Sequence, residues 1–126
     1  MKDTLLQRTQ GPLLIHVYTK IDEDPDISYL QQDYKAEPPE DRQRYLAQDK
    51  ARLDAHYRGD WHYVGVCCDI SIKTETNWAV PTVIGRSSVW GVESDSGEDY
   101  FKELAEEQIA EALADIERMK KALATI

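Results

Sequence analysis

The sequence is poor in cysteine, and the two cysteines that it has are adjacent. On a strand, Cys67 and Cys68 would point to opposite faces of the sheet, so a disulfide between them is not expected. We expect one thiol to lie in the core and the other to face across the sheet. Without a third or fourth cysteine there is no zinc framework, and we predict neither a metal nor a cofactor.

Long hydrophobic runs are also missing. No apolar stretch reaches the length of about 18 residues that indicates a membrane span, and no charged segment followed by an apolar one resembles a secretory signal. We therefore expect no contact with a membrane and a location in a cytoplasm. The length of 126 residues is typical of a single domain, residues 1–126, with one modest core.

Catalytic motifs are absent from the sequence as well. The three histidines, His16, His56 and His62, do not have the HExxH spacing, and none is tied by sequence to a cysteine nucleophile. There is no phosphate-binding glycine loop, no G-x-S-x-G turn and no dinucleotide fingerprint. We predict that the protein is not an enzyme.

Acidic residues are abundant and unevenly distributed. The chain has 24 acidic and 15 basic residues, a formal net charge of -9. Residues 1–20 have three bases against one acid, and residues 61–92 have two of each. Acids outnumber bases by eleven to six in residues 21–60 and by ten to four in residues 93–126. This balance argues against direct binding of nucleic acid and favours a basic protein as the partner.

Alternating side chains predict a strand over residues 61–73. The face that begins with Trp61 and Tyr63 is aromatic at one end and polar at the other. We expect an N-terminal strand, the loop at 20–39 or another subunit to cover part of it. The opposite face should pack against helices, and it consists of Val64, Val66, Cys68, Ile70 and Ile72.

Other segments complete a small antiparallel sheet of three to four strands. Pro81 limits residues 78–85 to an edge strand or a connection, because proline cannot complete a central ladder. The composition predicts strands at 13–18 and 89–93 and turns at 74–77 and 85–88. With two helices expected on one face, the fold class is α+β.

Two helices are predicted, and the second is the longest periodic segment of the chain. The first follows Pro38 and Pro39, runs from 40 to 57 with Leu46, Leu53 and Tyr57 on one face, and ends at Gly59. The second follows Ser96 and Asp99, which resemble a capping box. Its apolar stripe consists of Phe101, Leu104, Ala105, Ile109, Ala112, Leu113, Ile116, Met119 and Leu123.

Two segments show no sustained period. Residues 1–12 are predicted to be a mobile lead-in, and residues 20–39 an irregular acidic loop. The loop carries Asp22, Asp24, Asp26 and Asp33 at a spacing similar to a calcium loop, but the glycine and the glutamate of such loops are missing. We expect a solvated loop rather than a metal site, and helix capping rather than a cation at Glu93, Asp95, Glu98 and Asp99.

A row of acids on the long helix is the main candidate partner-binding surface. Residues four apart are neighbours on a helix, separated by about 6 Å of rise, which is similar to the spacing of phosphates along a nucleic-acid strand. The row is either a solvated face or a set of carboxylates presented to a basic groove in place of DNA or RNA. It consists of Asp99, Glu103, Glu107, Glu111 and Asp115, with Glu106 alongside.

Large aromatic residues form a second candidate surface. Trp61, Tyr63, Trp78 and Trp90 lie in or beside the predicted strands, and some fall on the face opposite the helices. Aromatic residues are most often core, but an exposed group of them would anchor a partner or a homodimer. Trp61 and Trp90 are the two that we assign to partner binding.

Two sequence segments resemble a group of small uncharacterised proteins of bacteriophages, prophages and plasmids. They are R-G-D-W-H-Y-V-G-V after Leu53 and V-W-G-V-E-S-D-S-G-E-D-Y, and the resemblance covers roughly residues 40–120. Val92 stands where the group has isoleucine, and Ser87-Ser88 stands where it has a glycine-containing turn. The resemblance implies a mobile-element origin, and not an activity.

Small acidic phage proteins are often inhibitors of host defence, such as anti-CRISPR and antirestriction proteins. The first hypothesis is therefore a non-enzymatic protein of this kind that binds and inhibits a basic nucleic-acid-binding defence protein or nucleoprotein in the bacterial cytoplasm, with DNA mimicry by the acidic helix as one way of doing so. The alternative is a structural or regulatory module that forms homo-oligomers through the aromatic sheet face. A third hypothesis is a small-molecule binder or hydrolase that uses the carboxylates at residues 93–99.

Overall fold

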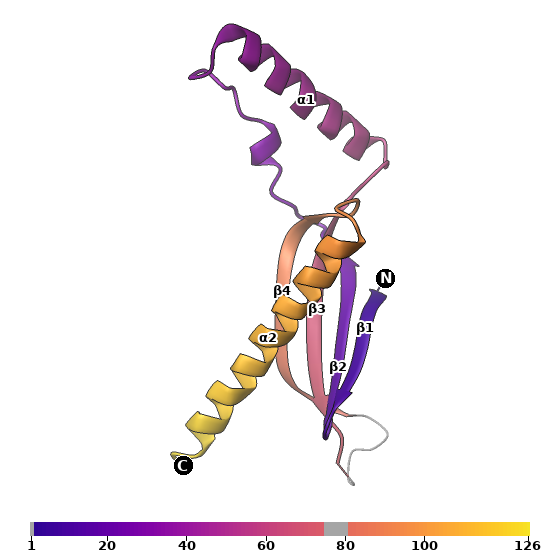
Figure 1. Ribbon diagram of the computed structural model, residues 1–126, viewed down its shortest axis with the longest axis vertical. Helices are drawn as coiled ribbons and strands as arrows, with labels where there is room; N and C mark the ends of the chain where they lie inside the picture. Colours follow the sequence, from indigo (N-terminus) through magenta and orange to yellow (C-terminus); the bar gives the residue numbers. More distant parts are fainter. Residues whose placement is uncertain (1, 75–80) are drawn as a thin grey trace.

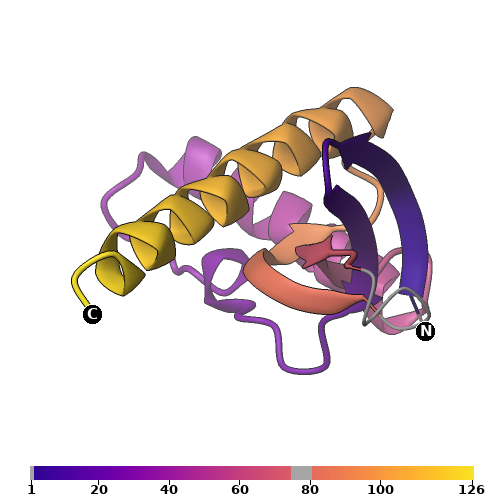
Figure 2. The same cartoon turned by 90° about the horizontal axis from the view of Figure 1, so that it is seen from below.

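A four-stranded antiparallel sheet forms the centre of the molecule. The computed structural model describes residues 2–74 and 81–126. The strands follow the order β1-β2-β3-β4, and α2 (Glu98–Leu123) lies along one face of the sheet (Figures 1 and 2). The α+β class and the long C-terminal helix are confirmed. The strands are β1 (Lys2–Gln10), β2 (Leu13–Ile21), β3 (Tyr63–Ile72) and β4 (Thr82–Glu93).

Residues 2–10 form an edge strand, so the predicted lead-in at 1–12 is wrong. β1 pairs with β2 from Lys2 opposite Lys20 to Gln10 opposite Leu13. Gly11, with a φ of 57°, closes the tight turn between them. Most of β1 is exposed, which explains why its sequence shows no clear alternation of apolar and polar residues.

The predicted turn at 85–88 is also wrong, because β4 runs through it. Gly85 was predicted to lie in a turn, but in the structure it allows close packing of β4 against α2. A Cβ at Gly85 would lie 2.8 Å from Cγ1 of Ile116 on α2. The part of the predicted 78–85 segment before Pro81 lies outside the described residues.

The core lies between the sheet and α2. The inner face of β3 contributes Val64, Val66, Cys68 and Ile70, as predicted. Cys68 is fully buried there, whereas Cys67 faces the opposite side of the sheet, and both thiols are free, as expected. Burial raises the pKa of Cys68 to about 11, so its thiol is neutral at physiological pH. From α2 come Leu104, Ala105, Ile109, Ala112 and Ile116.

The two ends of α2 differ from the sequence prediction. No capping box forms, because Gly97 is the N-cap and the Ser96 hydroxyl donates a hydrogen bond to the Glu93 carbonyl at 2.6 Å. The apolar stripe is buried as far as Ile116 only. Met119 and Leu123 are 44% and 58% exposed because the C-terminal part of α2 diverges from the sheet (Figures 1 and 2).

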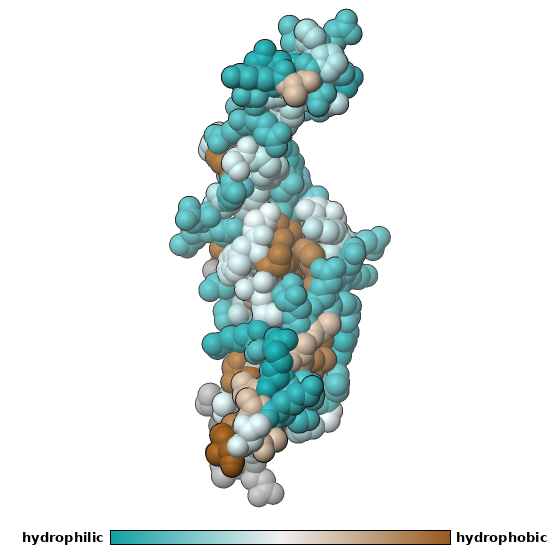
Figure 3. Space-filling model, turned by 90° about the vertical axis from the view of Figure 1, so that its left-hand side faces the viewer, coloured by the Kyte–Doolittle hydropathy of each residue, from teal (hydrophilic) through white to brown (hydrophobic). Residues whose placement is uncertain are grey.

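The first helix, α1 (Pro39–Tyr57), forms where predicted but does not lie on the sheet. It projects beyond one end of the strands (Figure 1), and hydrophilic side chains cover almost all of it in the space-filling view (Figure 3). No residue of α1 is buried, and Leu46 and Tyr57 are exposed rather than packed. Its C-terminal end is closed by Gly59, with a φ of 84°, as expected.

A small aromatic cluster connects α1 to the sheet. Trp61 and Tyr63 at the start of β3 are buried with Leu30 of the 3-10 turn η1 (Ser28–Leu30). The hydroxyls of Tyr29 and Tyr63 are 2.6 Å apart and share a hydrogen bond. The loop between β2 and α1 therefore covers the aromatic half of the outer sheet face, one of the three arrangements that we expected.

Candidate functional site

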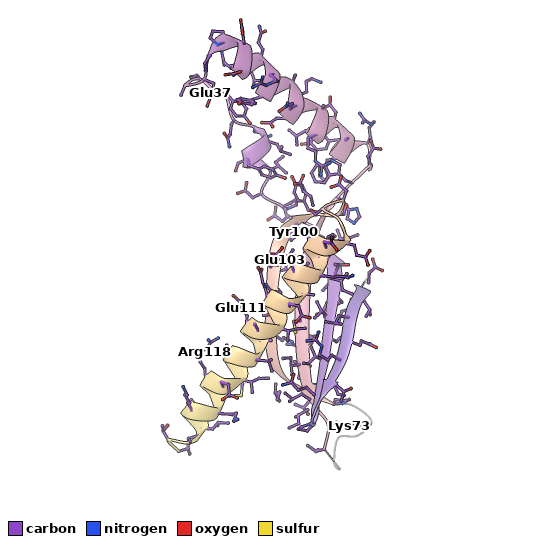
Figure 4. All side chains as sticks on the ribbon, in the orientation of Figure 1. Glu37, Lys73, Tyr100, Glu103, Glu111 and Arg118 are labelled. Carbon is purple, nitrogen blue, oxygen red and sulfur yellow. The ribbon has the colours of Figure 1, made fainter. Side chains whose placement is uncertain are left out.

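The acids of α2 lie mainly on the side of the helix that faces away from the sheet. Asp99, Glu103, Glu107 and Glu111 are exposed, whereas Asp115 is half-buried. Figure 4 shows Glu103 and Glu111 on α2 between Tyr100 and Arg118. The structure thus brings most of the predicted row together on one surface.

Helix geometry explains why Asp115 departs from the row. An α-helix has 3.6 residues per turn, so positions four apart are offset by about 40° around its axis. From Asp99 to Asp115 the offset accumulates to about 160°. Asp115 thereby turns toward the sheet side, where its carboxylate lies 3.5 Å from Arg118. The row follows a spiral rather than a straight line.

Glu106 differs from its neighbours because it is paired with a strand residue. Its carboxylate accepts hydrogen bonds from both terminal nitrogens of Arg8 on β1. These hydrogen bonds lower the pKa of Glu106, so it stays ionised to lower pH than an isolated glutamate. Because both side chains are substantially exposed, the pair contributes little to stability.

The remaining acids of the row keep their charge uncompensated. Within the described part of the chain, Asp99, Glu103, Glu107 and Glu111 form no ion pair. Successive members repel one another at helical spacing, which costs about 0.2 to 0.5 kcal/mol per pair. We call the exposed members of the predicted row, together with Glu106, the acidic ridge, and it consists of Asp99, Glu103, Glu106, Glu107 and Glu111.

The acids of the loop after β2 organise the backbone. Asp22 accepts hydrogen bonds from the amides of Asp24 and Gly91, at 3.1 and 3.0 Å. Asp26 and Asp33 each accept one from the amide two residues later. Among residues 2–74 and 81–126 no group of His, Cys, Asp or Glu side chains is placed to hold a metal ion. The D-x-D-x-D spacing is thus explained by Asx turns.

The carboxylates that precede α2 are paired with an arginine that was not predicted from the sequence. Arg52 of α1 donates to Glu93 at 2.8 Å and to both oxygens of Asp95 at 2.7 and 2.6 Å. Its guanidinium carbon lies 3.8 Å from the centroid of the Trp61 ring. The hydrogen bonds from Arg52 lower the pKa of Asp95. This cluster is a structural clamp between α1 and the turn that precedes α2.

The tryptophans do not form one surface. Trp61 is 2% exposed and its indole N–H donates to the Arg52 carbonyl at 3.1 Å, so its assignment to partner binding is wrong. Trp90 is 48% exposed on the outer face of the sheet and remains available. Trp78 lies outside the described residues.

A cavity on the outer sheet face, opposite α2, also escaped the sequence analysis. It has a volume of about 350 Å³ and lies between Tyr18 of β2 and Trp90 of β4. Lys2 and Lys20 contribute its positive charge, although they are 18 positions apart in the sequence. The pairing of β1 with β2 places the two lysines together, and it could not be predicted because the sequence of β1 shows no clear alternation.

Comparisons with known proteins give no match. No protein-family model matches the chain, and no curated protein or solved structure is significantly similar to it. No helix among the described residues has the length and hydrophobicity needed to cross a membrane. The arrangement of side chains is therefore the basis for a functional proposal.

Proposed function

We propose that this protein is a non-enzymatic inhibitor from a mobile genetic element that binds a basic, nucleic-acid-binding defence protein of its host through the acidic ridge. The anti-CRISPR or antirestriction type is the class that the phage-protein resemblance favours. The target would be a basic groove that normally holds DNA or RNA. The observation that carries the proposal is the set of exposed ridge carboxylates that form no ion pair within the described part of the chain, Asp99, Glu103, Glu107 and Glu111.

The position of the ridge supports a role in binding. α2 is held against the sheet by an apolar stripe, so its outer side is presented on a rigid element. The ridge carries repulsion that a fold alone does not require, and a basic partner would relieve it. The spiral of the row also suits a groove shaped for a helical polyanion better than a flat surface.

An enzyme is less well supported by the same geometry. Glu93 and Asp95, the carboxylates of the alternative hydrolase or small-molecule hypothesis, are both engaged by Arg52. Burial raises the pKa of Cys67, the opposite of what an activated nucleophile needs. The homo-oligomer alternative loses Trp61 as an anchor, because that side chain is enclosed by its own chain.

Affinity capture from bacterial lysate, followed by mass spectrometry, tests the proposal. Tagged protein should retain a nucleic-acid-binding protein at low salt and release it at high salt, because exposed charge interactions are screened. A variant with Glu103→Gln, Glu107→Gln and Glu111→Gln removes three carboxylates of the ridge. At roughly 0.2 to 1 kcal/mol each, it should bind the captured target about 3- to 150-fold more weakly.

A matched control separates a specific site from overall charge. Glu23→Gln, Glu37→Gln and Glu40→Gln change net charge equally at exposed positions away from α2. This variant should retain its affinity within about twofold, a difference of roughly 0.4 kcal/mol. Equal weakening by both variants would show that net charge acts without a site. Capture of the protein itself alone, at any salt, would refute the inhibitor hypothesis in favour of the homo-oligomer.

A further inference from the structure

The outer sheet face has a charge opposite to that of the molecule as a whole. Tyr18, Cys67 and Ser88 form one cross-strand row of this face. Asp69 and Arg86 are paired in the row on one side, with their charged groups 3.5 Å apart. The row on the other side carries two lysines and no acid. The face therefore has an excess of cations in a chain of net charge -9.

Lys2 and Lys20 are direct cross-strand partners. Like charges in this position repel, and the arrangement is unfavourable unless a negative group lies between them. Within the described residues neither ammonium forms an ion pair, and Lys2 lies 4.6 Å from the centroid of the Tyr18 ring. Both lysines line the same cavity. An anion placed there would contact two cations that have no protein counter-ion.

The indole ring of Trp90 lines the same cavity as the two lysines. Its six-membered ring lies directly over Gly65, where a Cβ would be only 2.2 Å from Cε3 of the indole. The indole N–H donates to the Ser88 hydroxyl at 3.1 Å, which fixes the orientation of the ring. Because Trp90 is 48% exposed, it retains aromatic surface on which a planar ligand can stack.

We propose that this cavity binds a mononucleotide, with the phosphate between Lys2 and Lys20 and the base against Trp90. Lysine ammonium groups are common phosphate ligands, and base stacking on tryptophan tolerates any of the bases. The volume of about 350 Å³ falls within the range of small-ligand sites, about 300 to 1,000 Å³. The site lies on the opposite face of the sheet from the acidic ridge and does not depend on it.

The surroundings favour a free nucleotide over a nucleic-acid strand. On the far side of Lys20 and Trp90 the surface is lined by Asp22, Glu23 and Asp24, which would repel a continuing phosphate chain. Cys67 and Tyr18 line the cavity as neutral groups, because burial raises their pKa values, that of Tyr18 to about 12. Asp69 and Arg86 also line the cavity, and their charged groups are paired at 3.5 Å. The positive charge is therefore confined to a region the size of one nucleotide.

Titration calorimetry of the full chain with the four ribonucleoside monophosphates tests this site. At least one should bind saturably, and the corresponding nucleoside without phosphate should bind at least about tenfold more weakly, because it lacks the charged group. Inorganic phosphate should also bind more weakly, because it cannot stack. A short single-stranded oligonucleotide should bind no more tightly than the mononucleotide.

Two variants and a control locate the binding. Lys2→Met with Lys20→Met should weaken mononucleotide binding at least about tenfold, and Trp90→Leu, which still covers Gly65, should weaken it about fivefold or more. Lys35→Met with Lys50→Met makes the same change of charge at lysines that are 79% and 78% exposed, and it should leave the affinity unchanged. Circular dichroism confirms that each variant is folded.

Three results would overturn the proposal. The first is the absence of saturable binding for all four monophosphates at millimolar concentration. The second is equal weakening by the two lysine pairs, which would indicate a general charge effect. The third is tighter binding of the oligonucleotide than of the mononucleotide, which would replace the free nucleotide by a nucleic-acid strand. None of these results depends on the binding of a protein to the acidic ridge.

Discussion

Replacing Arg52 by methionine should release α1 from the rest of the molecule. The arginine side chain is 31% exposed and bridges α1 to Glu93 and Asp95, with its guanidinium over Trp61. Methionine keeps an apolar stem to pack on the indole but removes every charged contact. Among the described elements, η1 is the one whose backbone lies close to α1, and the other contacts of the helix are made by side chains such as Leu53, which packs against the Trp61 and Tyr63 cluster.

The size of the effect follows from the contacts that are lost. Two partly exposed ion pairs contribute up to about 1 kcal/mol each, and a cation–π contact about 0.5 to 1 kcal/mol. Removing them should lower the free energy of local opening of α1 by about 2 kcal/mol, which corresponds to roughly 30-fold faster amide exchange. Because α2 and β3 from Val64 onward belong to the other core cluster, their exchange should change much less.

Hydrogen–deuterium exchange resolved by segment measures this difference. Lys50→Met is the matched control, since it removes a cation on the same helix whose pair with Asp54 is mainly exposed, and it should alter α1 exchange little. An increase in exchange spread equally over α1, α2 and β3 would refute the clamp. So would an unchanged α1 in the Arg52→Met variant.

The same clamp should respond to acid in a defined direction. Arg52 lowers the pKa of Asp95 in the folded state, whereas the unfolded value is about 3.9. The stabilising contribution is therefore complete above about pH 4 and is lost as the pH falls through the lowered pKa. In Arg52→Met this part of the acid dependence should disappear.

Three further changes test the packing and the ridge through the free energy of unfolding in urea. Gly65→Ala should lower the free energy of unfolding by about 1 to 3 kcal/mol, because the added methyl group displaces Trp90. The loss should be smaller when Trp90 is already replaced by leucine, and an equal loss in both backgrounds would rule out the contact. Gln108 is 5% exposed, and its Oε1 has no hydrogen-bond partner among the described residues. Gln108→Met should therefore stabilise the fold by about 1 kcal/mol. A loss of stability would show that the amide of Gln108 has a hydrogen-bond partner. The ridge variant, with Glu103→Gln, Glu107→Gln and Glu111→Gln, should gain roughly 0.6 to 1.5 kcal/mol, because three like-charge pairs are removed. No gain would mean that the carboxylates do not repel one another.

Much of the fold could be predicted from periodicity, and the errors have a common cause. The inner face of β3 and the stripe of α2 up to Ile116 were predictable because a buried face imposes its period on the sequence. The strand β1 and the packing of α1, though not the existence of α1, were misjudged because neither element buries a continuous face. β1 is almost entirely exposed, and α1 has no buried residue, so packing imposes no pattern on either of them.

The candidate sites were predictable only where their residues lie on one helix. The acids of α2 are visible in the sequence because helical spacing makes them neighbours. Even so, the spacing did not reveal that Asp115 winds toward the sheet side or that Glu106 is paired with Arg8. The Arg52 clamp required the relative position of α1, which local sequence does not encode.

The sheet separates two surfaces of opposite charge. Its inner face is covered by α2, whose outer side carries the acidic ridge. On its outer face neither α1 nor α2 lies along the strands, and strand pairing sets Lys2 beside Lys20 there. Packed layers lie about 10 Å apart, and exposed charges separated by more than the Debye length of about 8 Å at physiological ionic strength are largely screened by the surrounding solution. Neutralising the acidic ridge should therefore leave mononucleotide binding intact, and replacing the two lysines should leave the protein partner bound. The same set of variants can therefore test the two proposals independently.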